Sequence, residues 1–270
     1  MRTIKILLVT LFFSALAFGQ KSVSEVELRQ KTDSILNEAN TLYRYESAAW
    51  VTTDLAMAES NIKDDFGGYL VYVSGDTVKT IVRSKKTGRK IYCVSFTKEP
   101  QKPVLIEKID RDLTSNEAKL WTIKDDITQK AFTPEYKIGL YKGYNPVLEL
   151  IPYENKYKLY ILFGTSQRGY IPFGNDYVFF TNSEGKILNW RKFHSRIIET
   201  VTSVNGSSVA AVVHSHLPAE PYISATDICT FRLYAPVYGI NTFKVLSTAL
   251  PVLFEYNIKN NSITWEIMNR

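Results

Sequence analysis

The residues best suited to chemistry lie between His214 and Asp227, where two histidines one residue apart precede a serine and an aspartate. An apolar run, Val209–Val213, predicts a buried strand that continues into His214 and His216. Because alternate residues of a strand share a face, both imidazoles are expected on one side, where they can bind a single ion.

The segment after His216 predicts a loop followed by a helix. Pro218 and Pro221 disfavour both strand and helix, so the chain is expected to loop until Ser224, a favoured helix N-cap. Asp227 then falls in the first helical turn, where its carboxylate can join the imidazoles. Two histidines and one aspartate suit Zn²⁺ and leave a fourth position for water, as in catalytic zinc sites.

The spacing His-x-His, seven residues, Ser-x-x-Asp resembles the metal-binding motif of the JAB/MPN (JAMM) metalloprotease superfamily. The resemblance covers about residues 150–270 and matches every defining position. It implies an α+β fold, a mixed sheet with a flanking helix. It also implies zinc held by His214, His216 and Asp227, with Ser224 helping to stabilise an oxyanion. The residues after the motif fit this fold, because they predict a helix over Ile228–Tyr238 and then closing strands.

The family's catalytic acid/base is a glutamate placed directly ahead of an apolar strand. The matching strand here is Tyr177–Phe180, and Asp176 precedes it, with a side chain one methylene shorter than glutamate. Asp176 is therefore the candidate acid/base, provided that the backbone brings it within hydrogen-bond reach of the reacting water. Other nearby carboxylates are Glu149, Glu154, Glu184 and Glu199.

His194 is the remaining histidine of the chain and a rival metal ligand. If it approached the pair, a set of three histidines and one aspartate would use four protein ligands and close the site. The alternative, which we adopt as the expectation, is a partly exposed residue at a strand end beside Arg191 and Lys192.

Two functions follow from this resemblance. The first is a zinc-dependent peptidase or isopeptidase-like hydrolase, in which zinc lowers the pKa of a bound water for attack on a peptide carbonyl. The second is a secreted binding or structural module on a JAB-like fold, with or without the metal, and the absence of the glutamate favours it. The expected partner of the enzyme is a peptide or protein substrate.

The amino terminus has the pattern of a cleaved secretory signal peptide over residues 1–19. Arg2 and Lys5 precede an apolar stretch from Ile6 to Phe18, which is short for a membrane span. We therefore expect an exported, periplasmic or extracellular protein without a stable membrane anchor. Removing those two cations leaves 31 basic against 27 acidic residues, about +4, which does not indicate a nucleic-acid partner.

The rest of the chain predicts an amino-terminal α+β unit, residues 20–145, ahead of the metal-binding domain, residues 146–270. Ser22 to about Arg44 predicts an amphipathic helix with a broken continuation to Glu59, ended by Gly67-Gly68. Three meander strands are expected next, over residues 69–73, 77–83 and 90–96. An ambiguous charged segment follows over residues 113–129, and residues 134–146 are expected to connect the two units.

Two further features concern the cysteines and one loop. Cys93 and Cys229 are expected to be buried small apolar residues, although export leaves pairing open. Residues 164–176 predict a long turn-rich loop that could border a substrate groove.

Overall fold

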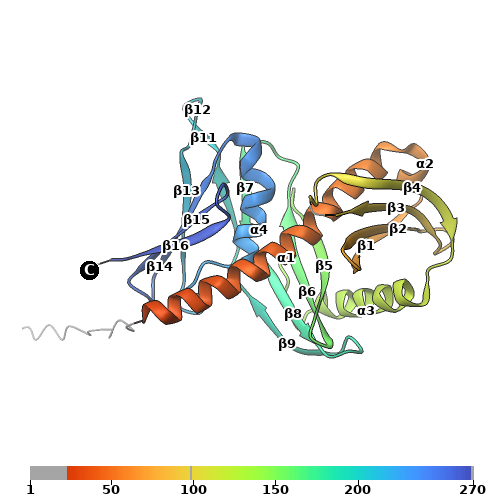
Figure 1. Ribbon diagram of the computed structural model, residues 1–270, viewed down its shortest axis with the longest axis horizontal. Helices are drawn as coiled ribbons and strands as arrows, with labels where there is room; N and C mark the ends of the chain where they lie inside the picture. The colour runs from red at the N-terminus through yellow and green to blue at the C-terminus, as the bar shows by residue number, and fades with distance from the viewer. Residues whose placement is uncertain (1–22, 98, 269–270) are drawn as a thin grey trace, which may run out of the picture.

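The computed structural model describes residues 23–97 and 99–268, and its mixed α+β architecture confirms the predicted fold class (Figure 1). The predicted signal peptide lies outside the described residues. Among the described helices, none combines the length and apolarity required to cross a membrane.

A single long helix, α1 (Glu25–Ala58), runs along much of the molecule (Figure 1). The Ser24 side chain caps it by accepting a hydrogen bond from the Glu27 amide at 3.1 Å. The expected break after Arg44 is absent, because small buried residues such as Ala48 and Ala49 let this half of the helix pack closely.

The first sheet has the order β1-β2-β3-β4 and lies between two helices. Its strands are β1 (Phe66–Ser74), β2 (Thr77–Ser84), β3 (Lys90–Phe96) and β4 (Pro103–Arg111). One face packs on α1, and the other packs on Trp121 of α3 (Ser115–Ala131). The short α2 (Ser60–Lys63) links α1 to β1. The three predicted meander strands are confirmed, and the ambiguous charged segment forms α3.

Gly67 and Gly68 do not end the helix as expected, because both lie inside β1. A Cβ atom on Gly67 would lie 2.7 Å from the Lys85 amide nitrogen, so only glycine allows this close approach of the two strands. Gly68 has a φ of +105°, at a register shift between Phe66 and Tyr69. These glycines therefore mark a strand irregularity.

The second sheet has the order β5-β6-β8-β9 and is antiparallel throughout. Its strands are β5 (Asn145–Tyr153), β6 (Lys156–Gly164), β8 (Tyr177–Thr181) and β9 (Ile187–Lys192). One core cluster joins Val94 of the first sheet to Tyr160 of the second and to Cys229 of the helix α4 (Ala225–Tyr234), so apolar packing crosses the predicted unit boundary. That division into units stays a prediction.

The third sheet, β13-β14-β15-β16, carries the two neighbouring histidines. Its strands are β13 (Ala211–His216), β14 (Thr242–Ser247), β15 (Val252–Asn257) and β16 (Ser262–Ile267). β13 and β14 are parallel, so the chain between them must cross over, and α4 (Ala225–Tyr234) and the 3-10 turn η1 (Ala235–Tyr238) make that crossover. The helix and closing strands expected after the motif are thus present.

Two short ribbons complete the fold. β7 (Tyr170–Gly174) pairs with β10 (Ile197–Val201), and β11 (Ser203–Val204) pairs with β12 (Ser207–Ser208). The expected long loop over residues 164–176 is therefore interrupted by a strand, whose Phe173 ring is fully buried and stacks on Phe243 at 4.9 Å. Burial of that ring explains why this stretch is ordered as β7.

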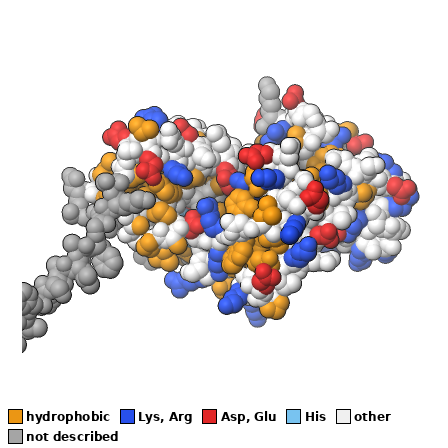
Figure 2. Space-filling view, turned by 90° about the horizontal axis from the view of Figure 1, so that it is seen from below, with side chains coloured by type: hydrophobic (Ala, Val, Ile, Leu, Met, Phe, Trp, Pro, Cys, Tyr) orange, Lys and Arg blue, Asp and Glu red, His pale blue; other side chains and the backbone are white. Residues whose placement is uncertain are grey.

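Cys93 and Cys229 are both buried and free, as the apolar interpretation predicted. They belong to different core clusters. Figure 2 shows the molecule from below, where hydrophobic side chains gather in the middle of the face among lysines and arginines.

Candidate metal centre

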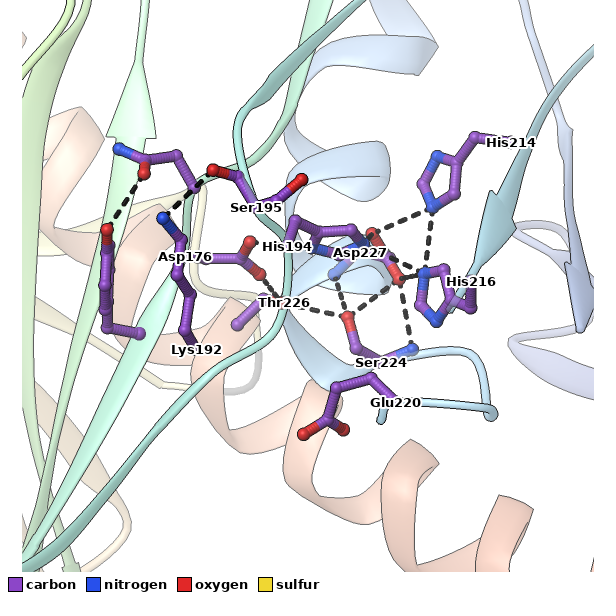
Figure 3. A network of polar contacts seen from close by, with 12 residues as sticks. Asp176, Lys192, His194, Ser195, His214, His216, Glu220, Ser224, Thr226 and Asp227 are labelled. Carbon is purple, nitrogen blue, oxygen red and sulfur yellow. Dashed lines mark hydrogen bonds and ion pairs between the residues drawn. The ribbon is translucent and has the colours of Figure 1, made fainter. Parts of the chain in front are cut away.

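Three elements bring four possible metal ligands to one buried point (Figure 3). His214 and His216 extend from β13, Asp227 from the first turn of α4, and His194 from the loop between β9 and β10. The ligand atoms of the four residues all lie within 4.8 Å of one another. The structure thus contains a group of three histidines and one aspartate that could hold a metal ion.

The strand pattern places the neighbouring histidines as the sequence predicted. Val213 is exposed, whereas Val212 and His216 are buried, so alternate residues of β13 face the interior. The two imidazoles stack at 5.0 Å with an interplanar angle of 12°, and their Nε2 atoms lie 3.0 Å apart. Both rings therefore present Nε2 to the same point.

Asp227 is positioned by a helix cap. The Ser224 hydroxyl accepts from the Asp227 amide at 3.0 Å, and Asp227 Oδ2 accepts from the Ser224 amide at 3.1 Å and from its hydroxyl at 2.7 Å. Oδ1 is buried without a hydrogen-bond partner. It lies 3.4 Å from Nε2 of His194 and 3.5 Å from Nε2 of His214. The cap uses one oxygen and leaves the other facing the imidazoles.

His194 is a member of the group, so the expectation of a partly exposed strand residue was wrong. Its side chain is only 5% exposed, and Nε2 lies 2.9 Å from Nε2 of His216. On the other side of the ring, Nδ1 lies 2.8 Å from Asp176 Oδ1. Asp176 is itself buried and also accepts a hydrogen bond from the Thr226 hydroxyl. The alternative of four protein ligands is the one that the structure brings together.

The outer hydrogen bonds fix the protonation of two rings. The Tyr222 carbonyl oxygen can only accept, so Nδ1 of His216, at 2.6 Å, must donate to it. The Asp176 carboxylate likewise accepts from Nδ1 of His194. Neutral rings held in this way present Nε2 lone pairs to each other at 2.9 Å, an arrangement that requires a shared proton or a cation.

The distances suit a small tetrahedral ion. Nε2 of His216 lies 2.9 Å from Nε2 of His194 and 3.0 Å from Nε2 of His214. These last two atoms lie 3.4 and 3.5 Å from Asp227 Oδ1, whereas His216 contacts the capping oxygen Oδ2 at 3.1 Å. A tetrahedron with metal–ligand bonds of about 2.0 to 2.1 Å has edges of about 3.3 to 3.4 Å, so small outward shifts would accommodate zinc.

Charge and burial act in opposite directions on these groups. Burial alone lowers the pKa of His194, but the Asp176 and Asp227 carboxylates outweigh it and raise that pKa to about 9. Burial lowers the pKa of His214 to about 4. For Asp227 burial raises the pKa, yet the three imidazoles hold it well below its usual value. The pocket therefore favours a positive charge beside Asp227.

A cleft of about 340 Å³ opens over the imidazoles. All three histidines line it together with Ser195, Arg196 and other residues. Its described lining does not include Asp176 or Ser224. The predicted acid/base and oxyanion residues lie behind the ligands, where Asp176 contacts His194 and Ser224 contacts Asp227. Their catalytic roles stay predictions.

The other carboxylates considered from the sequence lie elsewhere or face away. Glu149 is fully buried between the sheets, Glu199 accepts from the Tyr144 hydroxyl at 2.5 Å, and Glu184 lies in the hairpin between β8 and β9. Glu220, which sequence analysis missed, is near the cluster, but its carboxylate points away from the imidazoles and pairs with Arg191 at 3.1 Å (Figure 3).

Comparisons with protein-family models, with curated proteins and with solved structures found no match. The assignment therefore depends on the residues themselves. They provide a buried group of three histidines and one aspartate that could hold a metal, and the resemblance to JAB/MPN proteins stays at the level of the motif.

Proposed function

We propose that the protein is an exported zinc-binding module in which His194, His214, His216 and Asp227 form a closed metal centre. The single observation that carries this proposal is the position of His194, whose Nε2 lies 2.9 Å from Nε2 of His216 and 3.4 Å from Oδ1 of Asp227, near enough to be a fourth ligand of the same ion. Zinc with four protein ligands is typical of structural sites, and three protein ligands are typical of catalytic ones.

The residues around the ligands favour permanent binding by His194. Asp176 fixes the ring from behind, as carboxylates do for metal-bound histidines in many proteins, and the Thr226 hydroxyl donates to Asp176 in turn. When bound, zinc would supply a cross-link between β13, α4 and the loop after β9. We assign this structural cross-link as the function of the centre. The module as a whole would bind or organise other molecules outside the cytoplasm.

A second function, zinc-dependent hydrolysis of a peptide bond, is favoured by one observation. The cleft of about 340 Å³ gives access to all three imidazoles. Hydrolysis would require His194 to leave the ion, so that water could take its place, with Asp176 free to move the proton.

The test measures zinc content, stability and peptide hydrolysis in the same samples. We expect about one zinc per native chain, and we expect loss of zinc in His214→Ala and in Asp227→Ala. In Asp176→Asn, zinc should bind about 10- to 100-fold more weakly, because His194 loses its orienting partner. The control is Glu184→Gln, which changes an exposed hairpin carboxylate and should bind zinc like the native protein.

His194→Ala separates the two functions. A closed centre predicts weaker zinc binding, lower stability and no hydrolysis by the native protein. Zinc-dependent hydrolysis by the native protein that Asp176→Asn abolishes would establish the second function. Native protein free of zinc after purification in zinc-containing buffer, with unfolding unchanged by added zinc, would contradict both.

A further inference from the structure

A second cavity, of about 440 Å³, lies away from the metal centre, between α1, β1, β5, the end of β6 and α4. Its size falls in the range of small-molecule sites. Tyr234, the last residue of α4, lines it, whereas Asp227 lies in the first turn of the same helix. Seven residues of helix separate them by about 10 Å, so the cavity and the metal centre do not share ligands.

The polar lining of this cavity is acidic. Glu46 and Asp54 both line it, and no lysine or arginine appears among its described lining residues. Glu46 is 6% exposed, and its Oε2 atom is buried without a hydrogen-bond partner. Since a buried unpaired carboxylate oxygen is costly, the cavity contains a group that a ligand could satisfy.

A second carboxyl group lies behind the cavity wall. Glu149 is fully buried and lies close enough to Glu46 to share a hydrogen bond with it, and after burial its charge raises the pKa of Glu46 further. Lys124 is the nearby cation, but its Nζ donates to the Tyr69 carbonyl oxygen at 2.8 Å. Two carboxyl groups therefore share one ammonium. The raised pKa of Glu46 means that a proton on this group balances the set, and a bound cation would take the place of that proton.

Aromatic rings form much of the remaining wall. Trp50 and Tyr234 lie with ring centroids 5.1 Å apart at an interplanar angle of 58°, and Tyr69 lines the same cavity. The Tyr234 hydroxyl accepts from the Thr165 amide at 3.0 Å, which holds this ring in place. Faces of tryptophan and tyrosine attract cations as well as apolar groups.

We propose that this cavity binds a small organic cation, a protonated primary amine, whose ammonium group pairs with Glu46 and whose carbon skeleton packs against Trp50 and Tyr234. The acidic lining selects the charge, and the rings select an apolar or aromatic body.

The probe is phenethylamine, and phenethyl alcohol is its neutral counterpart of nearly equal size. Calorimetric titration of the purified protein should show binding of the amine and at least about tenfold weaker binding of the alcohol. Glu46→Gln should weaken amine binding by at least about tenfold, or about 1.4 kcal/mol. Glutamine has the shape of a protonated glutamate and the pKa of Glu46 is raised well above its usual value, so the variant should fold.

Trp50→Leu should weaken the amine and the alcohol together, and Glu184→Gln should change neither. Equal binding of amine and alcohol, unchanged amine binding by Glu46→Gln, or binding of neither probe by the native protein would each overturn the proposal. Zinc content measured on the same samples should not vary among these variants, so failure here is distinct from failure of the metal centre.

Discussion

Two buried carboxylates, Asp227 and Glu117, occupy the same local position but have different surroundings. Each is the third residue of a helix, and each closes a capping box, with Ser224 for α4 and with Thr114 for α3. Each side chain is at most 1% exposed. The backbone device is therefore the same, and what differs is the group that each carboxylate meets on its other side.

Glu117 meets permanent cations and ordinary donors. Arg111 contributes two hydrogen bonds, at 3.0 and 3.1 Å, Lys90 one at 3.1 Å and Tyr72 one at 2.8 Å. Asp227 instead keeps one oxygen without a hydrogen bond, facing the imidazoles of His194, whose outer nitrogen contacts Asp176, and of His214, whose outer nitrogen is buried without a partner. A carboxylate of the first kind is satisfied by the chain itself. One of the second kind belongs to a group that could hold a metal ion.

The largest expected difference between the two regions is the response to metal removal. Chelation of the native protein should lower the free energy of unfolding by about 4 kcal/mol if free zinc had been near a thousand times its Kd. The measurement is thermal unfolding with and without chelator. Asp227→Ala should show no response to chelator, whereas Glu117→Gln should retain the full response.

The next largest effect should come from Glu117→Gln itself. This change leaves Lys90, whose side chain is 4% exposed, without its anionic partner, so we expect a loss of about 3 kcal/mol. Denaturant unfolding at neutral pH in the presence of chelator measures this loss without any contribution from zinc. A loss below about 0.5 kcal/mol would contradict the interpretation that Glu117 is satisfied by contacts within the chain that stabilise the fold.

A smaller effect should appear on acidification. Despite burial, the hydrogen bonds from Arg111, Thr114, Tyr72 and Lys90 lower the pKa of Glu117 to about 2 from 4.5. A carboxylate with a lowered folded-state pKa stabilises above its unfolded pKa, and this contribution is lost as pH falls toward the folded value. Between pH 5 and pH 3 the chelated native protein should therefore lose about 2 kcal/mol more than chelated Glu117→Gln. Parallel stability curves for the two proteins would remove this assignment.

The comparison also explains how much could be predicted from the sequence. His214 and His216 lie on one strand and Asp227 lies on the helical turn that follows the next loop, so their spacing was enough to predict that they meet. His194 comes from a separate loop, and its approach depends on β7 and β10 pairing, which no local pattern specified. The available signal was chemical: it is the only other histidine in the chain, and Asp176 is near enough in sequence to orient it.

The fold shows the same division between local and distant causes. Strands β2 and β3 are rich in β-branched and aromatic residues and are bounded by turn residues, so they were predicted. β4 was missed, because its run Val104-Leu105-Ile106 is exposed at a sheet edge and lacks alternation. Helix α1 continues past Arg44 because tertiary packing on two sheets stabilises it, and its own sequence signals only a weakly amphipathic segment.

The contacts of α1 have a consequence for the order in which the protein folds. Its residues are made first, but Asn40 hydrogen-bonds Arg232 and Asn261, and Glu27 accepts from the Tyr222 hydroxyl, all near the other end of the chain. The surface of α1 can therefore be covered only after the last third of the polypeptide has been made. Contacts that close such long loops slow folding, so α1 should stay incompletely covered for a long interval while this chain is being made.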